Sequence, residues 1–368
     1  ESRIFVSRNR GKHTLPLKLS DEGAKPVIDA LLSWADVVLM NFRPGLAEKM
    51  GIDSKTLHAL HPRLVIGEIT PFGKQGPDAS LSAMDIVVQA RSGLMAAMGR
   101  IVDGRPAPGE PVISDYMAAM SLAFGISSAL FRRERTGVGG IVDVSLMKAA
   151  MTLTNNQLVR SEDLDRDKHL ERIELLNRQR RDGESFETQM GAIPTARVLP
   201  LRAIYFRTYE AADSTIAIAC ASRALQVRFL KALDHADPSL ESPGDARYDD
   251  VYYTTLQAEI EAKIRSKSAA EWVTILNDAG VPVSTVKFPI EMFEDPQAEA
   301  NGMFYIVEHP TAGRFRVLSP PVSLDNEGFR APPATPPFAS ETRRLLGELG
   351  FDEPGIQTLL DAGVTRSG

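Results

Sequence analysis

The stretch Ala35-Asp36-Val37-Val38-Leu39-Met40 decides the fold, because a short continuous run of aliphatic residues is typical of a strand buried on both faces of a parallel sheet. Apolar residues at helical spacing precede it from Ser20 to Leu32, and a second helical pattern follows from about Ser54 to Leu60. Leu64-Val65-Ile66-Gly67-Glu68-Ile69 has the character of another parallel strand. Strand and helix thus alternate along the first third of the chain, which predicts an α/β fold with a Rossmann-like, doubly wound large domain.

The remainder of the chain predicts a smaller unit and two connectors. Residues 160–187 are densely charged, which is typical of a solvated helical linker. A strand pattern from Thr215 to Ala221 followed by helical patterns predicts a small α+β domain, and the proline-rich residues 319–337 predict an extended connector. We therefore predict five segments: 1–158, the N-terminal part of the large domain; 159–194, the charged linker; 195–305, the small α+β domain; 306–338, a Pro-rich return linker; and 339–368, a C-terminal part that completes the large domain.

Composition restricts the class of protein. The chain has 368 residues, 43% of them apolar, and a net charge of −6, so it lacks the basic surface that nucleic acid requires. No apolar stretch approaches the roughly 20 uncharged residues of a membrane span, and Glu1-Ser2-Arg3-Ile4 does not begin a secretory signal. The single cysteine, Cys220, excludes a disulfide within the chain, and no residue spacing indicates a metal site. These features predict a cytoplasmic enzyme with no membrane or nucleic-acid partner.

A single acid stands where a long uncharged helical stretch begins. Asp115 precedes the run from Tyr116 to Phe131, and the charged segment from Arg132 to Gly137 closes it. Ser114 or Asp115 could cap the helix, since side-chain oxygens there accept hydrogen bonds from free backbone N–H groups. A carboxylate at this place could equally be a chemical reagent. The local pattern leaves both interpretations open.

A collinear series of short segments across residues 9–145 resembles the class III coenzyme A transferases. This family also includes carnitine CoA-transferase-like proteins, formyl-CoA transferase and α-methylacyl-CoA racemase. The segments are, in order, Asn9–Lys12, Ala35–Val38 with Asn41–Gly45, His61–Val65, Phe72–Pro77, Gln89–Gly93, the Asp115 segment, and Arg133–Gly140 with Val142–Ser145. The resemblance implies an interlocked homodimer, in which the linkers of each chain wrap around the other.

The resemblance places Asp115 at the position of the family's catalytic aspartate. There the carboxylate attacks the thioester of an acyl-CoA and forms a mixed anhydride, and the released thiolate then gives an aspartyl-CoA thioester. A carboxylic acid acceptor takes the activated position and finally the CoA. The residue type agrees with this role, because a carboxylate is a sufficient nucleophile without a partnered base. The start of a helix would favour its ionised form and supply N–H donors for the oxyanions.

The same resemblance implies that coenzyme A, or acyl-CoA, binds as substrate and that no cofactor is tightly bound. Asn41, Phe42 and Arg43, which follow the first strand, and Lys49 occupy positions that line the CoA site. Leu17 and Lys18 occupy positions that border the nucleotide. Cations at a strand's carboxyl end can meet phosphate directly. The alternatives are an ordinary turn at Arg43 and an exposed helix charge at Lys49.

Met84 distinguishes among the activities of the family. In the racemase branch a histidine at this position serves as one of the α-proton acid/base groups, and a thioether cannot transfer a proton. The sequence therefore favours a CoA-transferase. An acyl-CoA racemase or epimerase remains the nearest enzymatic alternative. We expect Met84 to lie against the thioester region or in the core.

The start of the chain raises a third alternative. The family normally carries a strand-turn-helix-strand unit ahead of the Asn9–Lys12 segment, and that unit holds part of the CoA cleft. Here the sequence begins almost at this segment. A truncated or divergent member could then be a non-catalytic CoA-binding or scaffold protein.

Overall fold

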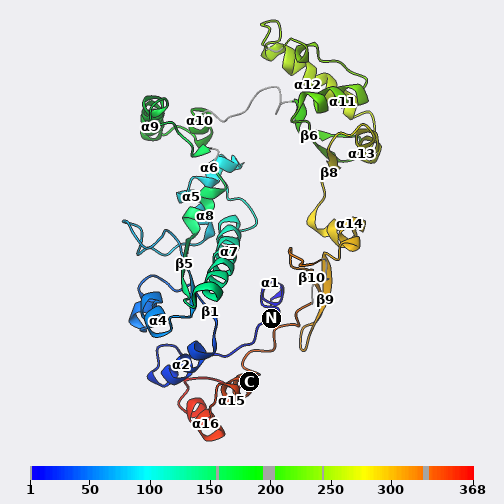
Figure 1. Cartoon of the computed structure of the whole chain (residues 1–368). Helices are drawn as coiled ribbons and strands as arrows, with labels where there is room; N and C mark the ends of the chain where they lie inside the picture. Colours follow the sequence, from blue (N-terminus) through cyan, green and yellow to red (C-terminus); the bar gives the residue numbers. More distant parts are fainter. Residues whose placement is uncertain (1, 155–156, 194–203, 243, 326–330) are drawn as a thin grey trace. The chain divides into compact units, whose positions relative to one another are not determined.

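The computed structural model describes residues 2–154, 157–193, 204–242, 244–325 and 331–368 (Figure 1). These residues fall into two compact units. The first comprises the described parts of Glu1–Ile193, Ile306–Phe315 and Arg330–Gly368, and the second those of Pro194–Tyr305 and Arg316–Phe329. The predicted boundary at residues 194 and 195 lies outside the described residues.

A three-stranded parallel sheet forms the centre of the first unit. Its strands are β1 (Val37–Met40), β2 (Val65–Thr70) and β5 (Gly140–Ser145), in the order β1-β2-β5. Met40 pairs with Glu68, and Thr70 pairs with Ser145, so the carboxyl ends of all three strands lie at one edge of the sheet. The predicted mixed α/β fold with a parallel sheet is confirmed.

One face of this sheet is covered by the two helices that the sequence predicts. Ile66 of β2 is fully buried and packs with Leu32 of α2 (Lys25–Trp34) and Leu57 of α4 (Ser54–Leu60). Helix α4 begins after Asp53, whose side chain accepts hydrogen bonds from the backbone N–H groups of the first turn. Successive strand residues point to opposite faces of the sheet, so Gly67, which follows Ile66, faces the side opposite to α2 and α4.

Helix α7 (Ile113–Thr136) covers the opposite face at close range. A Cβ atom at Gly67 of β2 would lie 3.0 Å from Ile126 Cδ1 and 3.1 Å from Leu122 Cδ1. A Cβ atom at Gly125 of α7 would lie 2.5 Å from Val142 Cγ1 of β5. These two glycines are therefore required for the close approach of helix and sheet, which fixes the position of α7.

Helix α7 is also long and apolar enough to cross a membrane by length and composition, the one such helix in the described part of the chain. The expectation that no stretch approaches a membrane span is therefore wrong on composition. Such a helix is weak evidence for a membrane protein, because core helices have the same composition. Here 22% of its most apolar stretch is buried in this unit, and α7 contacts β2, β5 and α8 as a core helix does.

Shorter elements complete the first unit. They are α1 (Arg3–Arg8), η1 (Glu22–Ala24), α3 (Leu46–Lys49), α5 (Asp85–Arg91), α6 (Leu94–Met98), β3 (Ile101–Val102), β4 (Arg105–Pro106), α8 (Leu146–Thr152), α9 (Arg166–Arg181), α10 (Phe186–Gly191), α15 (Thr342–Glu348) and α16 (Glu353–Asp361). Helix α9 occupies the charged stretch, and Leu176 is its one buried residue.

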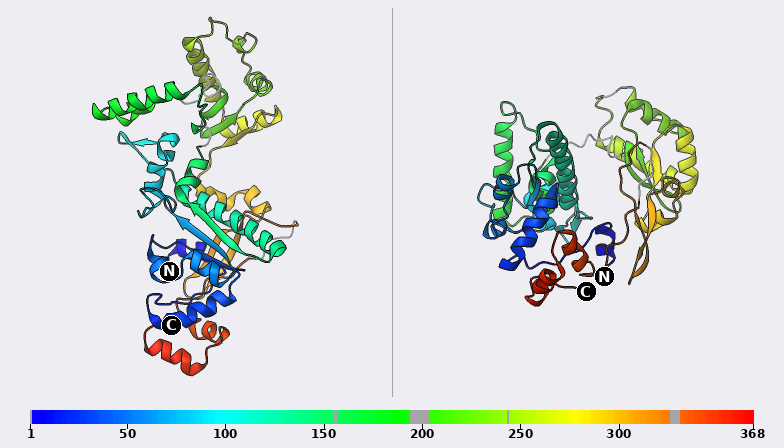
Figure 2. Two further views of the ribbon diagram at one scale, coloured as in Figure 1. Left: turned by 60° about the vertical axis from the view of Figure 1, so that its left-hand side comes forward. Right: turned by 60° about the horizontal axis from the view of Figure 1, so that its bottom comes forward.

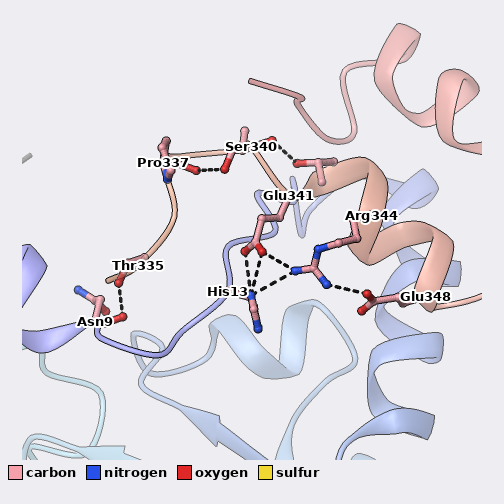
Figure 3. Close-up of polar contacts among 10 residues, drawn as sticks. Asn9, His13, Thr335, Pro337, Ser340, Glu341, Arg344 and Glu348 are labelled. Carbon is pink, nitrogen blue, oxygen red and sulfur yellow. Dashed lines mark hydrogen bonds and ion pairs between the residues drawn. The ribbon is translucent and has the colours of Figure 1, made fainter. Parts of the chain in front are cut away.

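The C-terminal helices pack against the N-terminal part of the first unit. Leu346 of α15 and Ile356 of α16 share a buried cluster with Val27 of α2, and Figure 2 shows α15 and α16, in red, beside the blue N-terminal helices. Polar contacts hold the same junction. His13 Nδ1 lies 2.9 Å from Glu341 Oε2 and 3.2 Å from a guanidinium nitrogen of Arg344 (Figure 3).

The second unit contains an antiparallel sheet and three longer helices. The strands β6 (Phe206–Glu210), β7 (Thr215–Ala219) and β8 (Val283–Thr285) have the order β6-β7-β8, and the helices are α11 (Arg223–Ala232), α12 (Asp250–Ile264) and α13 (Ala269–Asp278). Trp272, Phe229 and Tyr209 are at the centre of its core. Cys220 is fully buried there, and burial raises the pKa of its thiol to about 11, so the thiol is unreactive.

Residues 289–318 hold short elements, one of which the sequence did not predict. They are η5 (Pro289–Glu294), α14 (Pro296–Ala300) and the hairpin of β9 (Phe304–His309) with β10 (Gly313–Leu318); η4 (Pro238–Leu240) lies earlier in the chain. The hairpin occupies the beginning of the stretch predicted as a return linker. The proline-rich residues 331–337 that follow have no regular secondary structure.

Candidate active site

Asp115 lies in the first turn of α7, two residues after the helix begins. The N-cap residue is Val112, whose side chain makes no capping hydrogen bond. The backbone N–H groups of Ser114 and Asp115 instead donate to Asp85 Oδ1, at 2.8 and 3.3 Å. The cap of this helix therefore comes from a residue far away in the sequence, and neither Ser114 nor Asp115 performs it. The Asp115 carboxylate remains free for another role.

Asp85 is itself held by a buried glutamine. Asp85 opens α5 and is 7% exposed, and Gln89, one turn further on, is fully buried. Gln89 Nε2 donates to Asp85 Oδ2 at 2.5 Å and to the carbonyl oxygen of Gly109 at 3.1 Å, while Gln89 Oε1 accepts from Gly109 N at 2.9 Å. The segment that leads into α7 is therefore anchored at Gly109 by Gln89 and at Ser114 by Asp85.

The electrostatic environment makes Asp115 a stronger base than an ordinary aspartate. Although the residue is solvent-exposed, partial burial of its carboxyl raises its pKa, and the nearby charge of Asp85 raises it further. The expectation that the helix start favours the ionised form is therefore wrong on balance. Arg8 acts in the opposite direction; its guanidinium lies 5.7 Å from the ring centre of Tyr116. A carboxylate with a raised pKa is a better nucleophile once ionised.

A pocket of about 460 Å³ lies at the carboxyl edge of the sheet, and its lining includes Met84 and Val87 but neither Asp85 nor Asp115. The loop after β1 contributes Asn41, Phe42 and Arg43 to its wall, and Met84 lines it from the N-terminal end of α5. The Met84 side chain is 77% exposed, so it belongs to an open pocket wall and not to the core. Pro44, Pro71, Ser82, Ala83 and Val87 complete the lining.

A second pocket, of about 360 Å³, includes part of the same loop, and several charged residues line it. Phe42, Arg43 and Pro44 line both pockets. Lys74 lies in the second pocket, pairs with Glu68 and donates to Ser54 Oγ at 3.4 Å. The loop after β1 therefore contributes to a mainly apolar pocket that Met84 also lines and to a pocket with several charges of both signs.

The sequence profile of CoA-transferase family III matches residues 1–342. This chain belongs to CoA-transferase family III. The resemblance found in the sequence is thereby confirmed, and the protein is an enzyme of a family that uses acyl-CoA substrates.

Similar proteins include several CoA-transferases. The chain is 27% identical to cinnamoyl-CoA:phenyllactate CoA-transferase of Clostridium sporogenes, over 98% of this chain and 82% of the relative. It is 30% identical to acetyl-CoA:oxalate CoA-transferase of Acetobacter aceti, over 82% and 72%. The crystal structure of Rv3272 from Mycobacterium tuberculosis superimposes with a TM-score of 0.72 and 25% identity, covering 92% of this chain and 85% of that one.

The structure brings some of the predicted class III site residues together and separates others. Asn41, Phe42, Arg43 and Met84 line one pocket. Lys49 is exposed at the end of α3 and lines neither pocket that contains Arg43.

Leu17 and Lys18 lie at the C-terminal tail instead. Leu17 forms an isolated β-bridge with Thr365, and the backbone N–H of Lys18 donates to Val364 O at 2.9 Å. The side chain of Lys18 pairs with Asp21 at 3.1 Å. Neither residue lines a pocket with Arg43.

Three site residues of this family III protein were not identified from the sequence as contributors. Asp85 accepts from Asp115 N across 30 residues of sequence, and Gln89 donates to Gly109 O across 20 residues. No local pattern predicts such contacts. Lys74 carried a weak signal, because it follows the second predicted strand, where a ligand is expected in an α/β sheet. Among the described residues no group of His, Cys, Asp and Glu could hold a metal ion.

Proposed function

We propose that this protein transfers coenzyme A from an acyl-CoA donor to a carboxylic acid acceptor, with Asp115 as the nucleophile. The observation that supports this most is the placement of Asp115. Its carboxylate does not cap the helix and has a raised pKa. The backbone N–H of Asp115 donates to Asp85, which follows the pocket-lining Met84 in the sequence. Asp115 itself lines neither of the two pockets described above, but a nucleophile held in a fixed position is what acyl transfer requires.

The reaction proceeds by four displacements without a net change in protons or redox state. Asp115 attacks the thioester carbonyl carbon, the carbon–sulfur bond breaks, and CoA thiolate leaves a mixed anhydride. The thiolate attacks the aspartyl carbonyl and expels the donor acid. The acceptor carboxylate then attacks the aspartyl-CoA thioester and displaces the thiolate, which finally attacks the acceptor's carbonyl and regenerates Asp115. The backbone N–H groups of Ser114 and Asp115 already donate to Asp85, so the oxyanions would need other donors than these two.

Coenzyme A would extend from Asp115 along the loop of Asn41, Phe42 and Arg43. Its thioester end would lie in the pocket lined by Met84, and its phosphates would meet Arg43 and Lys74 in the charged pocket. Lys49, Leu17 and Lys18 remain proposed contacts on the resemblance alone. As substrate, CoA binds and leaves with each cycle and is not a resident cofactor.

We also propose that the protein is a cytoplasmic homodimer. The outward face of α7 carries large apolar side chains that stay exposed in the single chain: Tyr116, Met120, Phe124 and Phe131. Contiguous exposed apolar surface on a helix is costly in water and is typical of a protein interface. An interlocked dimer would cover it. Sedimentation of the purified protein tests this, since a monomer at micromolar concentration would contradict it.

The mechanism is tested by CoA exchange and by trapping the aspartyl intermediate. The purified protein is incubated with a panel of acyl-CoA donors and isotopically labelled acids, CoA exchange is followed by mass spectrometry, and hydroxylamine converts an Asp115 thioester to a hydroxamate. Asp115→Ala should abolish both signals, and Asp29→Ala, a change of an exposed acid on α2, should preserve them. Equal behaviour of wild type and Asp115→Ala would contradict the mechanism.

The same samples test the other two functions. Deuterium uptake at the α-carbon without acyl exchange would indicate a racemase. Binding of CoA without turnover would indicate a scaffold.

A further inference from the structure

We infer that Gln89 is a positioning residue for Asp115: its side-chain amide ties the Asp85 carboxylate to the Gly109 peptide and so fixes the turn from which Asp115 acts. This inference rests on the proposed nucleophilic role of Asp115. Gln89 lies one helical turn beyond Asp85 on α5, so both side chains lie on the same side of the helix. Its side chain is fully buried.

The hydrogen bonds of Gln89 leave its amide one orientation. Gly109 N can only donate and Gly109 O can only accept, so Oε1 must face the nitrogen and Nε2 the oxygen. The second hydrogen of Nε2 then points to Asp85 Oδ2, at 2.5 Å. Both amide hydrogens and the amide oxygen are therefore used, as a fully buried amide requires.

Asp85 depends on this glutamine for its orientation. Oδ2 is occupied by Gln89, and Oδ1 is consequently directed at the backbone N–H groups of Ser114 and Asp115. Rotation of the carboxylate away from α7 would break three hydrogen bonds in a buried place, which is unfavourable. Gln89 thus selects the rotamer of Asp85 that caps the catalytic helix.

Gly109 is the second residue that Gln89 holds, besides Asp85. A Cβ atom there would collide with the side chain of Met98 on α6, so the backbone passes close to that helix. Gln89 holds Gly109 and Asp85 holds Ser114, so the segment between them has little freedom. The position and orientation of the first turn of α7 are therefore both fixed. A displacement of about 1 Å at a nucleophile lowers turnover by about a hundredfold.

The hydrogen bond from Gln89 also determines how close the charge of Asp85 lies to Asp115. The charge of Asp85 is one of the groups that raise the pKa of Asp115, and its effect depends on the rotamer that Gln89 selects. Loss of Gln89 should therefore lower the pKa of Asp115 as well as loosen the turn. A glutamine that only stabilised the fold would do neither in the folded protein.

The experiment compares Gln89→Met and Gln89→Glu with the control Gln226→Met. Methionine keeps the length of the side chain and removes its hydrogen bonds. Gln226 is a partly buried glutamine of the second unit with a hydrogen bond to Cys220 O, so its replacement reports the general cost of such a change. For each folded variant we measure kcat and KM for an acyl-CoA and the pH profile of carbodiimide labelling at Asp115, read by peptide mass spectrometry.

For Gln89→Met we expect kcat to fall by about tenfold or more with KM within about twofold, since only placement of the nucleophile is lost. Its Asp115 labelling profile should move to lower pH. Gln89→Glu places a second carboxylate against Asp85, so its kcat should recover as the pH falls and one proton is shared between the two. Gln226→Met should match wild type in kcat and in labelling.

The inference is overturned if Gln89→Met melts at a lower temperature but keeps the wild-type kcat and labelling profile. If Gln89→Met does not fold, Gln89→Glu decides, because a pH dependence equal to that of wild type would contradict the inference. Labelling requires no turnover. If wild type forms no Asp115 adduct with any acyl-CoA, the proposed function fails, while the labelling profiles still decide whether Gln89 controls Asp115.

Discussion

Replacement of Asp85 by alanine should destabilise the first turn of α7. The change removes the acceptor for three donors, which are the backbone N–H groups of Ser114 and Asp115 and the amide of Gln89. Ser114 and Gln89 are fully buried, so water cannot easily replace the lost acceptor for these two. Asp115 is exposed, and its N–H can turn to water.

The magnitude follows from those two buried donors. Each unsatisfied buried donor costs about 1–3 kcal/mol, so we expect a loss of about 2–5 kcal/mol after partial relaxation. That is a substantial part of the roughly 5–15 kcal/mol by which a folded protein is stable. Asp85→Asn should lose less, because its amide oxygen can still accept from α7, although its NH₂ group then faces Gln89 Nε2.

Hydrogen exchange of the α7 first turn is the direct assay. A loss of about 2 kcal/mol corresponds to roughly thirtyfold faster exchange of the amides at Ser114 and Asp115. Asp78→Ala is the matched control, since Asp78 forms an exposed ion pair with Arg91 of the same α5, and such pairs contribute about 0–1 kcal/mol. If the first-turn amides of Asp85→Ala exchange as slowly as those of wild type and Asp78→Ala, Asp85 does not cap α7.

Three further changes test the packing and charge around this helix. Asp115→Asn should stabilise the protein at neutral pH, because burial and Asp85 disfavour the ionised carboxylate of the wild type. Since the wild-type pKa is raised, this gain in the free energy of unfolding is lost as the pH falls below the ordinary value of 3.8. Equal urea unfolding of variant and wild type at both a neutral and an acidic pH would contradict this. Gly125→Ala should cost about 1–3 kcal/mol by overpacking against Val142, and Val142→Ala should relieve most of it in the double mutant, so additive losses in a double-mutant cycle would contradict direct contact. Ser114→Ala should leave the melting temperature unchanged or raise it, since Ser114 Oγ is buried without a hydrogen-bond partner among the described residues; a drop of several degrees would reveal a partner.

Much of the sheet and its helices could be predicted because their signals are local. The helix Ser54–Leu60 was predicted with the bounds of α4, since Asp53 supplies a cap directly before it. The strands β1 and β2 lie within two residues of their predicted positions, because buried parallel strands are continuous apolar runs. The hairpin of β9 and β10 was missed, as its strands alternate weakly and are followed by prolines.

The site was only partly predictable, for a different physical reason. Asp115 could be proposed from the position of one acid at the start of an uncharged helix, together with the resemblance. Its local context suggested a cap, yet the helix begins two residues earlier and takes its cap from Asp85. A hydrogen bond across 29 residues leaves no periodic trace in a sequence. The positions of Leu17 and Lys18 likewise depend on Val364 and Thr365, at the far end of the chain.

The same separation in sequence bears on how the fold would support the proposed nucleophile without a partnered base. The sheet holds α7 at close range through Gly67 and Gly125, which fixes the axis of the helix but not its first turn. The first turn is fixed by Asp85, which also raises the pKa of Asp115. One buried carboxylate therefore positions the proposed nucleophile and, after burial, contributes to its raised pKa, and these two effects cannot be changed independently. A variant that moves Asp85 should alter both the reach and the basicity of Asp115, whereas a variant in the glycine contacts should alter only the reach.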